Sequence, residues 1–317
     1  MKTRKASGLV VYAALAANLA LAVMKFAGSW WTGSSAMLSE AIHSVVDSCN
    51  QSLLLYGRYR ASRPPDAAHS FGYGMELFFW GFVVALLIFA FGGALSIYEG
   101  VLKIRDPAPV TGPWVNFAIL IAAAVFEGIS LRLAWLETER AHPGHSPLAA
   151  VRASKDPSIF IILMEDAAAL CGLAIAAICL AAEYLLEAPV LDGVGSVLIG
   201  SLLIGTAALL ARETRSLLTG ESASRGVLAD VRDLLQEDGR IDSVGEILSM
   251  HIGPDEILLA ATVKLKESDG CSAALGDLTR RVSEHCPQIR QVFLSVSHDD
   301  ECVSGPHPLT AQPLGTR

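Results

Sequence analysis

The sequence is short of charge, and especially of positive charge. Charged residues make up 18% of its 317 positions against 52% for hydrophobic ones, and the mean hydropathy is +0.45. A soluble globular chain carries about 25% charged residues, so these numbers favour a protein embedded in a lipid bilayer. The net charge of -8 leaves no basic face for phosphate groups, and we expect no nucleic acid among its partners.

Closely spaced cysteines are also lacking. The six cysteines are scattered, and none belongs to a CxxC pair. A zinc ribbon would need such pairs, and a disulfide framework would need a small, cysteine-rich chain. We therefore expect reduced thiols and no structural metal held by cysteine.

Long hydrophobic segments take the place of charge. A helix that crosses a bilayer needs about 20 mostly apolar residues. Six segments meet that length, at residues 8–30, 34–56, 75–102, 113–136, 157–184 and 189–211. The first continues well past the apolar core of a secretory signal, which has about 7–15 residues. We expect a retained helix there and an α-helical polytopic membrane protein with six transmembrane helices.

Lys and Arg are distributed unevenly between the two sets of connections. Cytoplasmic flanks carry an excess of these residues. One set holds nine of them: Lys2, Arg4, Lys5, Arg58, Arg60, Arg63, Arg140, Arg152 and Lys155. The other set holds Lys103 and Arg105. The bias predicts that both termini are cytoplasmic.

After about residue 213 the pattern becomes that of a soluble α+β module. Helical periodicity occurs at 226–236 and 274–286, and strand patterns occur at 244–253, 256–266 and 289–298. The expected order is α-β-β-α-β, as in a ferredoxin-like domain. We divide the chain into a membrane domain over 1–213, a cytoplasmic domain over 214–298 and a disordered tail over 299–317.

Ionisable residues interrupt the second hydrophobic segment, which reads SEAIHSVVDSCN over positions 39–50. Residues three, four and seven apart share one face of a helix. Glu40, His43, Asp47 and Asn50 follow that spacing and form one polar stripe. Each ionisable side chain at membrane depth costs about 2.5–3.5 kcal/mol on insertion scales, and such residues mark ion paths or proton relays.

The pair His43 and Asp47 has the chemistry of half a metal site. Imidazole and carboxylate suit Zn²⁺, whereas Mg²⁺ and Ca²⁺ prefer oxygen ligands alone. Both groups bind metal in their deprotonated form, so binding displaces protons, as proton-driven metal export requires. The alternative is a structural hydrogen bond between helices.

The other half of the site is expected on the fifth segment, which carries Glu165 and Asp166 in an apolar run. Neighbours on a helix diverge by about 100°, so the two cannot point equally at one ion. Asp166, followed by small residues that permit close helix packing, is the expected ligand. Glu165 remains open as a hydrogen-bond acceptor behind the ligands, a proton carrier, a partner for a cation on a neighbouring helix, or a further ligand.

Other polar residues in these segments have simpler interpretations. Lys25 can extend towards the membrane surface or pair with an acid. Glu127 fits a proton path and a structural pairing equally well. The glycines Gly195, Gly200 and Gly205 favour close packing of the sixth segment.

Three stretches carry a more specific pattern. They read KFAGSWWTGSSAMLSEAIHSVVDSCNQ, RPPDAAHSFGYGMELFFW and ALSIYEGVLKI. They resemble the cation diffusion facilitator family, in particular its zinc-transporter branch. The resemblance implies a homodimer with a cytoplasmic dimerisation domain that exchanges a cytosolic divalent metal for protons. The expected substrate is Zn²⁺, with Co²⁺, Fe²⁺, Mn²⁺, Ni²⁺ and Cd²⁺ as alternatives, and no organic cofactor is expected.

By motif, the resemblance assigns His43, Asp47 and Asp166 as metal ligands. The remaining family position, normally His or Asp, falls at Ile162. Glu165, Glu40, Asn50 or water must then complete the shell. Ile162 also keeps a second interpretation open, a non-transporting membrane protein that anchors a metal-sensing or dimerising tail.

The remaining expectations concern class and location. No serine or cysteine nucleophile lies near a candidate base in the sequence, so we expect a transporter and not an enzyme. We expect it in the cell (inner) membrane of a bacterium. In the tail, His251 and His285 are expected to be exposed residues that bind no metal.

Overall fold

The structure is a computed structural model that describes residues 3–141, 157–254, 256–266 and 271–296. It divides into two compact units, one of Met1–Glu221 with His251–Glu256 and the other of Ser222–Met250 with Ile257–Arg317. The tail expected to be disordered, 299–317, lies outside the described residues. The domain boundaries drawn above therefore stay predictions.

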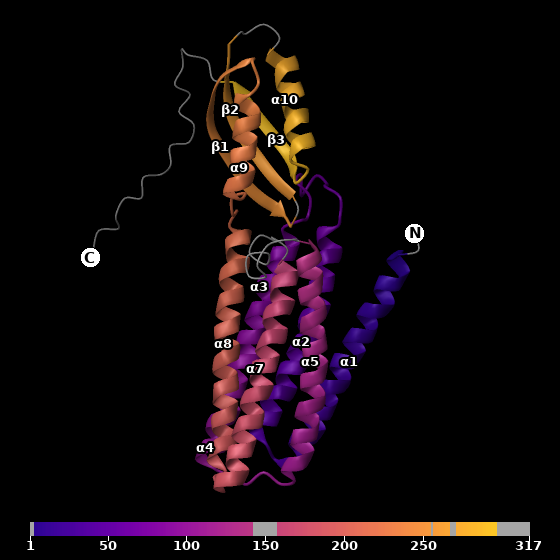
Figure 1. The fold of residues 1–317 in the computed structure, drawn as a ribbon, viewed down its shortest axis with the longest axis vertical. Coiled ribbons are helices and arrows are strands. Elements are labelled where there is room, and N and C mark those ends of the chain that lie inside the picture. Colours follow the sequence, from indigo (N-terminus) through magenta and orange to yellow (C-terminus); the bar gives the residue numbers. More distant parts are fainter. Residues whose placement is uncertain (1–2, 142–156, 255, 267–270, 297–317) are drawn as a thin grey trace, which may run out of the picture. The chain divides into compact units, whose positions relative to one another are not determined.

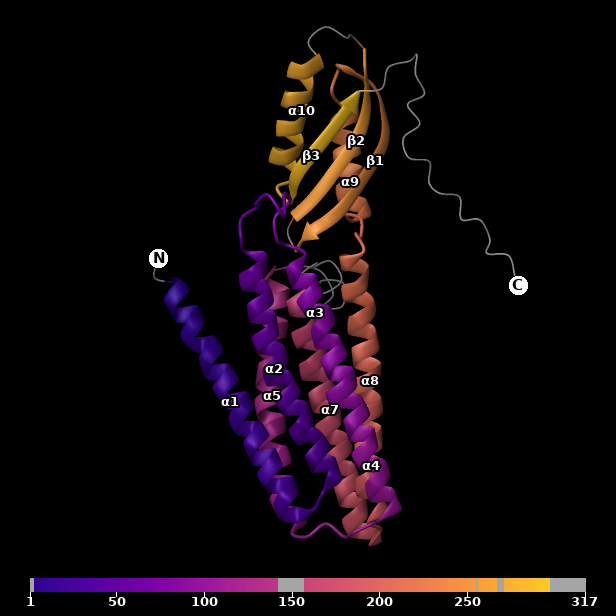
Figure 2. The ribbon, with the colours of Figure 1, turned by 180° about the vertical axis from the view of Figure 1, so that it is seen from behind.

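The first unit is a bundle of long helices (Figures 1 and 2). Its elements are α1 (Thr3–Thr32), α2 (Ser35–Ala61), α3 (Glu76–Leu87), η1 (Ile88–Ala94), α4 (Leu95–Arg105), α5 (Pro113–Ala141), α7 (Pro157–Leu186) and α8 (Val190–Leu218). The π-helical segment η1 joins α3 and α4 into one continuous helix of 30 residues. Within the bundle, α7 packs against both α2 and α5.

Among the residues that the structure describes, four helices are long and apolar enough to cross a membrane. They are Glu76–Arg105, Pro113–Leu136, Pro157–Leu186 and Val190–Leu218, which match the third to sixth segments expected from the sequence. The described parts of α1 and α2 do not meet the same criteria, although these helices have 30 and 27 residues. In α2 the polar stripe and several serines lower the hydropathy. Six crossings therefore stay a prediction.

The helix pair α4 and α8 packs backbone against backbone. A Cβ atom on Gly100 would lie 2.7 Å from the Gly193 carbonyl oxygen, and one on Gly193 would lie 2.8 Å from the Gly100 carbonyl oxygen. One level further along, on η1, a Cβ on Gly200 would lie 2.7 Å from the Gly93 carbonyl oxygen. Only glycine fits such contacts. Gly200 thus has the packing role expected of it, whereas a Cβ on Gly205 would meet no atom within 4 Å.

A carboxylate from α8 holds the first turn of α2. Asp192 is fully buried and accepts hydrogen bonds from the Ser34 hydroxyl at 2.6 Å, the Ser35 hydroxyl at 2.9 Å and the Ala36 backbone N–H at 3.2 Å. The first N–H groups of a helix lack partners within the helix and favour a negative charge. Ser34 adds the usual cap by accepting from the Met37 N–H. These bonds fix where α2 begins and hence which face it turns inward.

The second unit has the expected order, with α9 (Arg225–Gln236), β1 (Ile241–Gly253), β2 (Glu256–Leu265), α10 (Cys271–His285) and β3 (Ile289–Val296). The sheet order is β1-β2-β3, and β2 pairs with β3 in parallel from Ile257 opposite Ile289 to Val263 opposite Val296. Alternate residues of β2 are buried, and they pack with apolar residues of α9 and α10. This gives two layers, with the helices against one face of the sheet.

Two local features of the C-terminal part of the chain bear on the predictions for it. His251 lies at the end of β1 that belongs to the first unit, and it is buried, which corrects the expectation that it is exposed. Asp238 follows α9, is buried and accepts hydrogen bonds from Arg240 at 2.8 Å and 2.7 Å and from Arg281. The guanidinium groups, Arg240 first, hold the pKa of Asp238 well below its ordinary value.

Candidate metal site

The polar stripe of α2 faces the interior of the bundle. Glu40, His43, Asp47 and Asn50 are all buried, whereas Val45 on another face is 36% exposed. The helical spacing read from the sequence therefore does place these four side chains on one inward face. Burial of this many polar groups in an apolar bundle is costly unless they are paired or bind a ligand.

His43 and Asp47 lie together but leave atoms free. The His43 Nδ1 atom is 3.4 Å from Asp47 Oδ1, which is long for a hydrogen bond. Neither ring nitrogen of His43 nor Asp47 Oδ1 makes a hydrogen bond to any residue that the structure describes. Buried polar atoms without partners are rare in folded proteins. These three atoms are of the types that bind a transition metal.

The acidic pair of α7 divides between two neighbouring helices. Glu165 and Asp166 are both buried. Glu165 Oε1 accepts a hydrogen bond from Asn50 Nδ2 of α2 at 2.6 Å, and Asp166 Oδ2 accepts one from the Ser130 hydroxyl of α5 at 2.8 Å. Their divergence around the helix is as expected. It is Glu165, however, that contacts the α2 stripe directly.

Several carboxyl groups act on Asp47 together. Glu165, Glu127, Asp166 and Lys25 all lie near enough to Asp47 to interact with it electrostatically. The structure thus brings carboxyl groups from α2, α5 and α7 into one region. Within the described ranges, no group of three or more His, Cys, Asp or Glu has the geometry to hold a metal ion. Ile162, where the family pattern has a ligand, is half-buried on α7.

Some contacts of this region were missed or left open at the sequence level. The role of Ser130 was missed because nothing in a lone serine distinguishes it from its many equivalents. Lys25 was expected to snorkel or pair, and it pairs: its Nζ donates to Glu40 Oε2 at 3.1 Å and to the Ser44 hydroxyl at 2.8 Å. The signal for that pair was present, since a lysine in the middle of an apolar run needs an acid.

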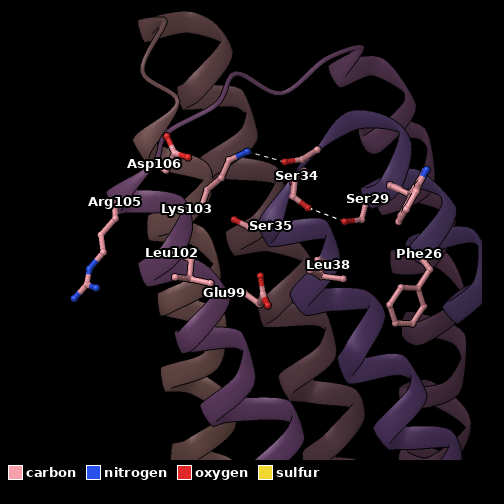
Figure 3. A pocket seen from close by; sticks show the side chains of 12 residues that line it. Phe26, Ser29, Ser34, Ser35, Leu38, Glu99, Leu102, Lys103, Arg105 and Asp106 are labelled. Atoms are coloured by element: carbon pink, nitrogen blue, oxygen red, sulfur yellow. Dashed lines mark hydrogen bonds between the residues drawn. The ribbon is translucent and has the colours of Figure 1, made fainter.

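A separate cavity of about 890 Å³ lies between α1, α2 and α4, near the start of α2 (Figure 3). In its wall Ser29 donates to the Ser34 carbonyl oxygen at 2.9 Å, and Lys103 donates to the Gly33 carbonyl oxygen at 2.7 Å. The predicted ligands are not among its lining residues. The cavity is therefore distinct from the candidate metal site.

The fold and the buried stripe define a multi-pass helical membrane protein with an acidic, histidine-containing interior. The profile of the cation efflux transmembrane domain matches residues 11–219. The chain therefore belongs to the cation efflux family, which confirms the resemblance to cation diffusion facilitators.

Individual relatives agree with this assignment. The chain is 33% identical over 256 residues to metal tolerance protein C4 of Arabidopsis thaliana, covering 80% of this chain and 56% of the relative. It is 32% identical over 261 residues to the mitochondrial proton-coupled zinc antiporter SLC30A9 of Homo sapiens, covering 82% and 46%. It is 34% identical over 122 residues to the cation-efflux pump FieF of Cronobacter sakazakii, covering 37% and 40%. The chain thus spans about half the length of the first two.

Proposed function

We propose that the protein exports a divalent transition-metal cation, Zn²⁺ first, from the cytosol in exchange for protons. The observation that carries the proposal is the buried pair His43 and Asp47, whose ring nitrogens and Oδ1 atom have no hydrogen-bond partner among the described residues. Support for zinc and for protons comes from the human relative, whose name describes a proton-coupled zinc antiporter.

In this proposal all six long hydrophobic segments cross the membrane, including α1 and α2, and both termini lie in the cytoplasm. The protein works as a homodimer. A bacterial cell membrane stays a prediction, since the relatives include both a mitochondrial antiporter and a bacterial efflux pump.

The ion is bound by His43, Asp47 and carboxylate from α7. Asp166 remains the predicted ligand, and Glu165, which already contacts Asn50 of the stripe, is the neighbouring candidate. The ligands bind the ion deprotonated from the cytosolic side, the bundle rearranges, and protonation on the other side releases it. Metal ions and protons compete for the same ligand atoms, so export of a metal ion is coupled to entry of protons.

The test is zinc uptake into liposomes that contain the purified protein, under an imposed pH gradient. We expect uptake that collapses when the gradient is removed and that is lost in Asp47→Ala and in Asp166→Ala. The matched control is Asp106→Ala, because Asp106 is an exposed acid outside the cluster. Parent-like transport by both cluster variants would show that the site assignment is wrong.

The second candidate function is a membrane-anchored metal sensor that transports nothing, and the apolar Ile162 at a ligand position favours it. This candidate predicts that calorimetry of the full chain finds zinc binding that Asp47→Ala leaves unchanged, with no zinc flux in liposomes. The transporter predicts the loss of both in the same variant.

A further inference from the structure

Lys25 is a buried cation held by two contacts from α2. Its side chain and that of Glu40 are both 0% exposed, and the Nζ atom donates to Glu40 Oε2 at 3.1 Å and to the Ser44 hydroxyl at 2.8 Å. Taking an ion pair out of water carries a large desolvation cost. A leucine at each position would fill the space without that cost, so packing alone does not account for the pair.

Glu40 belongs to the same stripe as the predicted ligands and still has an unused oxygen. Its Oε1 atom has no hydrogen-bond partner in the described part of the chain. That atom lies against Gly172 of α7, where even a single Cβ atom would collide with it. This carboxylate oxygen lies between α2 and α7, on the same face of α2 as His43 and Asp47, while the other oxygen of Glu40 is held by Lys25.

The charge of Lys25 also reaches the predicted ligands. It acts electrostatically on His43, Asp47 and Glu127 as well as on Glu40. Ser44, its second partner, is the residue next to His43. Coulomb interactions are strong where water is excluded, so a positive charge here opposes the binding of a divalent cation, and Glu40 offsets that effect while the pair is intact.

We propose that Lys25 is a positioning residue that keeps Glu40 out of the coordination shell of the transported ion. Its ammonium group pairs with the Glu40 carboxylate, which leaves His43, Asp47 and the α7 carboxylates as ligands. With fewer carboxylate ligands, the site does not bind the metal ion too tightly to release it. This inference rests on the proposed metal transport. It removes Glu40 from the residues that could complete the coordination shell.

The test uses three variants of the full chain, Lys25→Met, Glu40→Gln and the double variant, with zinc affinity measured by competition against a fluorescent chelator. Lys25→Met releases a carboxylate and is expected to tighten zinc binding by about tenfold. Glu40→Gln leaves the ammonium unpaired and is expected to weaken binding by about as much. The double variant removes both charges and should return to within about threefold of the parent.

Other outcomes overturn the inference in distinguishable ways. If Glu40 is a ligand, the double variant binds as weakly as Glu40→Gln. If the pair only pins α1 to α2, all three variants keep the affinity of the parent, and only their unfolding temperatures fall. Should Lys25→Met fail to fold, the comparison of Glu40→Gln with the double variant decides the question alone.

An Asp47→Ala arm separates this inference from the proposed function. If the parent binds no zinc, or Asp47→Ala binds it equally well, the metal-site assignment itself has failed and this inference falls with it. If Asp47→Ala abolishes binding but the opposite shifts of the Lys25 and Glu40 variants are absent, only the role of Lys25 is refuted.

Discussion

Two helix interfaces in the same bundle are built on opposite principles. Between α4 and α8, glycines face carbonyl oxygens, and a Cβ atom would not fit on either side. Between α2 and α7, polar side chains meet, and several of their atoms find no partner in the described residues. At the first interface the backbones are in close contact, and the glycines there have no side chain that could bind an ion. The second provides unpaired atoms of the kinds that bind a metal ion.

The largest effect is expected from opening the glycine interface. Gly100→Leu places a side chain where a single Cβ would already lie 2.7 Å from the Gly193 carbonyl oxygen, so the helices must separate. We expect a loss of about 3 kcal/mol or more in the free energy of unfolding, since overpacking against backbone has no flexible neighbour to yield. Thermal unfolding in detergent measures it. The control is Gly205→Leu, where no atom lies within 4 Å of the added Cβ; equal losses in both would refute the comparison.

A smaller loss is expected from Asp192→Ala, which removes the acceptor at the start of α2. The Ser34 and Ser35 hydroxyls and the Ala36 N–H lose their partner in a buried place. Buried donors without acceptors cost about 1–3 kcal/mol each when nothing replaces the bond, and water entry will recover part of this, so we expect a net loss of about 2 kcal/mol. Asp106→Ala, at an exposed aspartate, should leave the unfolding temperature unchanged. A parent-like Asp192→Ala would contradict the capping role.

Asn50→Ala probes the polar interface itself. It leaves Glu165 without its donor at 2.6 Å, and we expect a loss of about 1 kcal/mol in unfolding free energy. Zinc affinity should change as well, because Glu165 becomes free to approach Asp47. Ser52→Ala is the control, since the Ser52 hydroxyl donates to the Ser48 carbonyl oxygen of its own helix and not to an α7 residue that the structure describes. If Asn50→Ala and Ser52→Ala bind zinc with the same affinity, Glu165 does not take part in the metal site.

The smallest effect concerns the second unit, where the buried carboxylate of Asp238 is paired with Arg240 and Arg281. The pKa of Asp238 is lowered by Arg240, so its charged form stabilises the folded state above the ordinary pKa of an aspartate, and this contribution is lost as pH falls through the lowered value. The protection factors of the α9 and α10 amides, which are corrected for the intrinsic exchange rate at each pH, should fall by a few fold between neutral pH and about pH 3. Asp238→Asn should be less stable at neutral pH and show a flatter pH profile. A steep profile in Asp238→Asn would assign the acid sensitivity to other groups.

The sequence was sufficient for features that depend on periodicity and composition. The polar stripe of α2, the hydrophobic segments from residue 75 onward and the α-β-β-α-β order all follow from spacing along the chain. It was insufficient for contacts that depend on how one helix is rotated relative to its neighbour. Nothing in the acidic pair of α7 says that Glu165 meets Asn50 while Asp166 meets Ser130, and nothing distinguishes Gly200, which touches a backbone, from Gly205, which does not.

The glycine interface also restricts how the bundle can move. Its contacts alternate between a glycine and bulky neighbours, since Ile97 and Ile204 flank the sites where backbones touch. Sliding α8 along α4 by even one residue would drive an isoleucine side chain into a carbonyl group. We therefore expect α4 and α8 to keep their register, and any rearrangement around an ion to take place in the other helices.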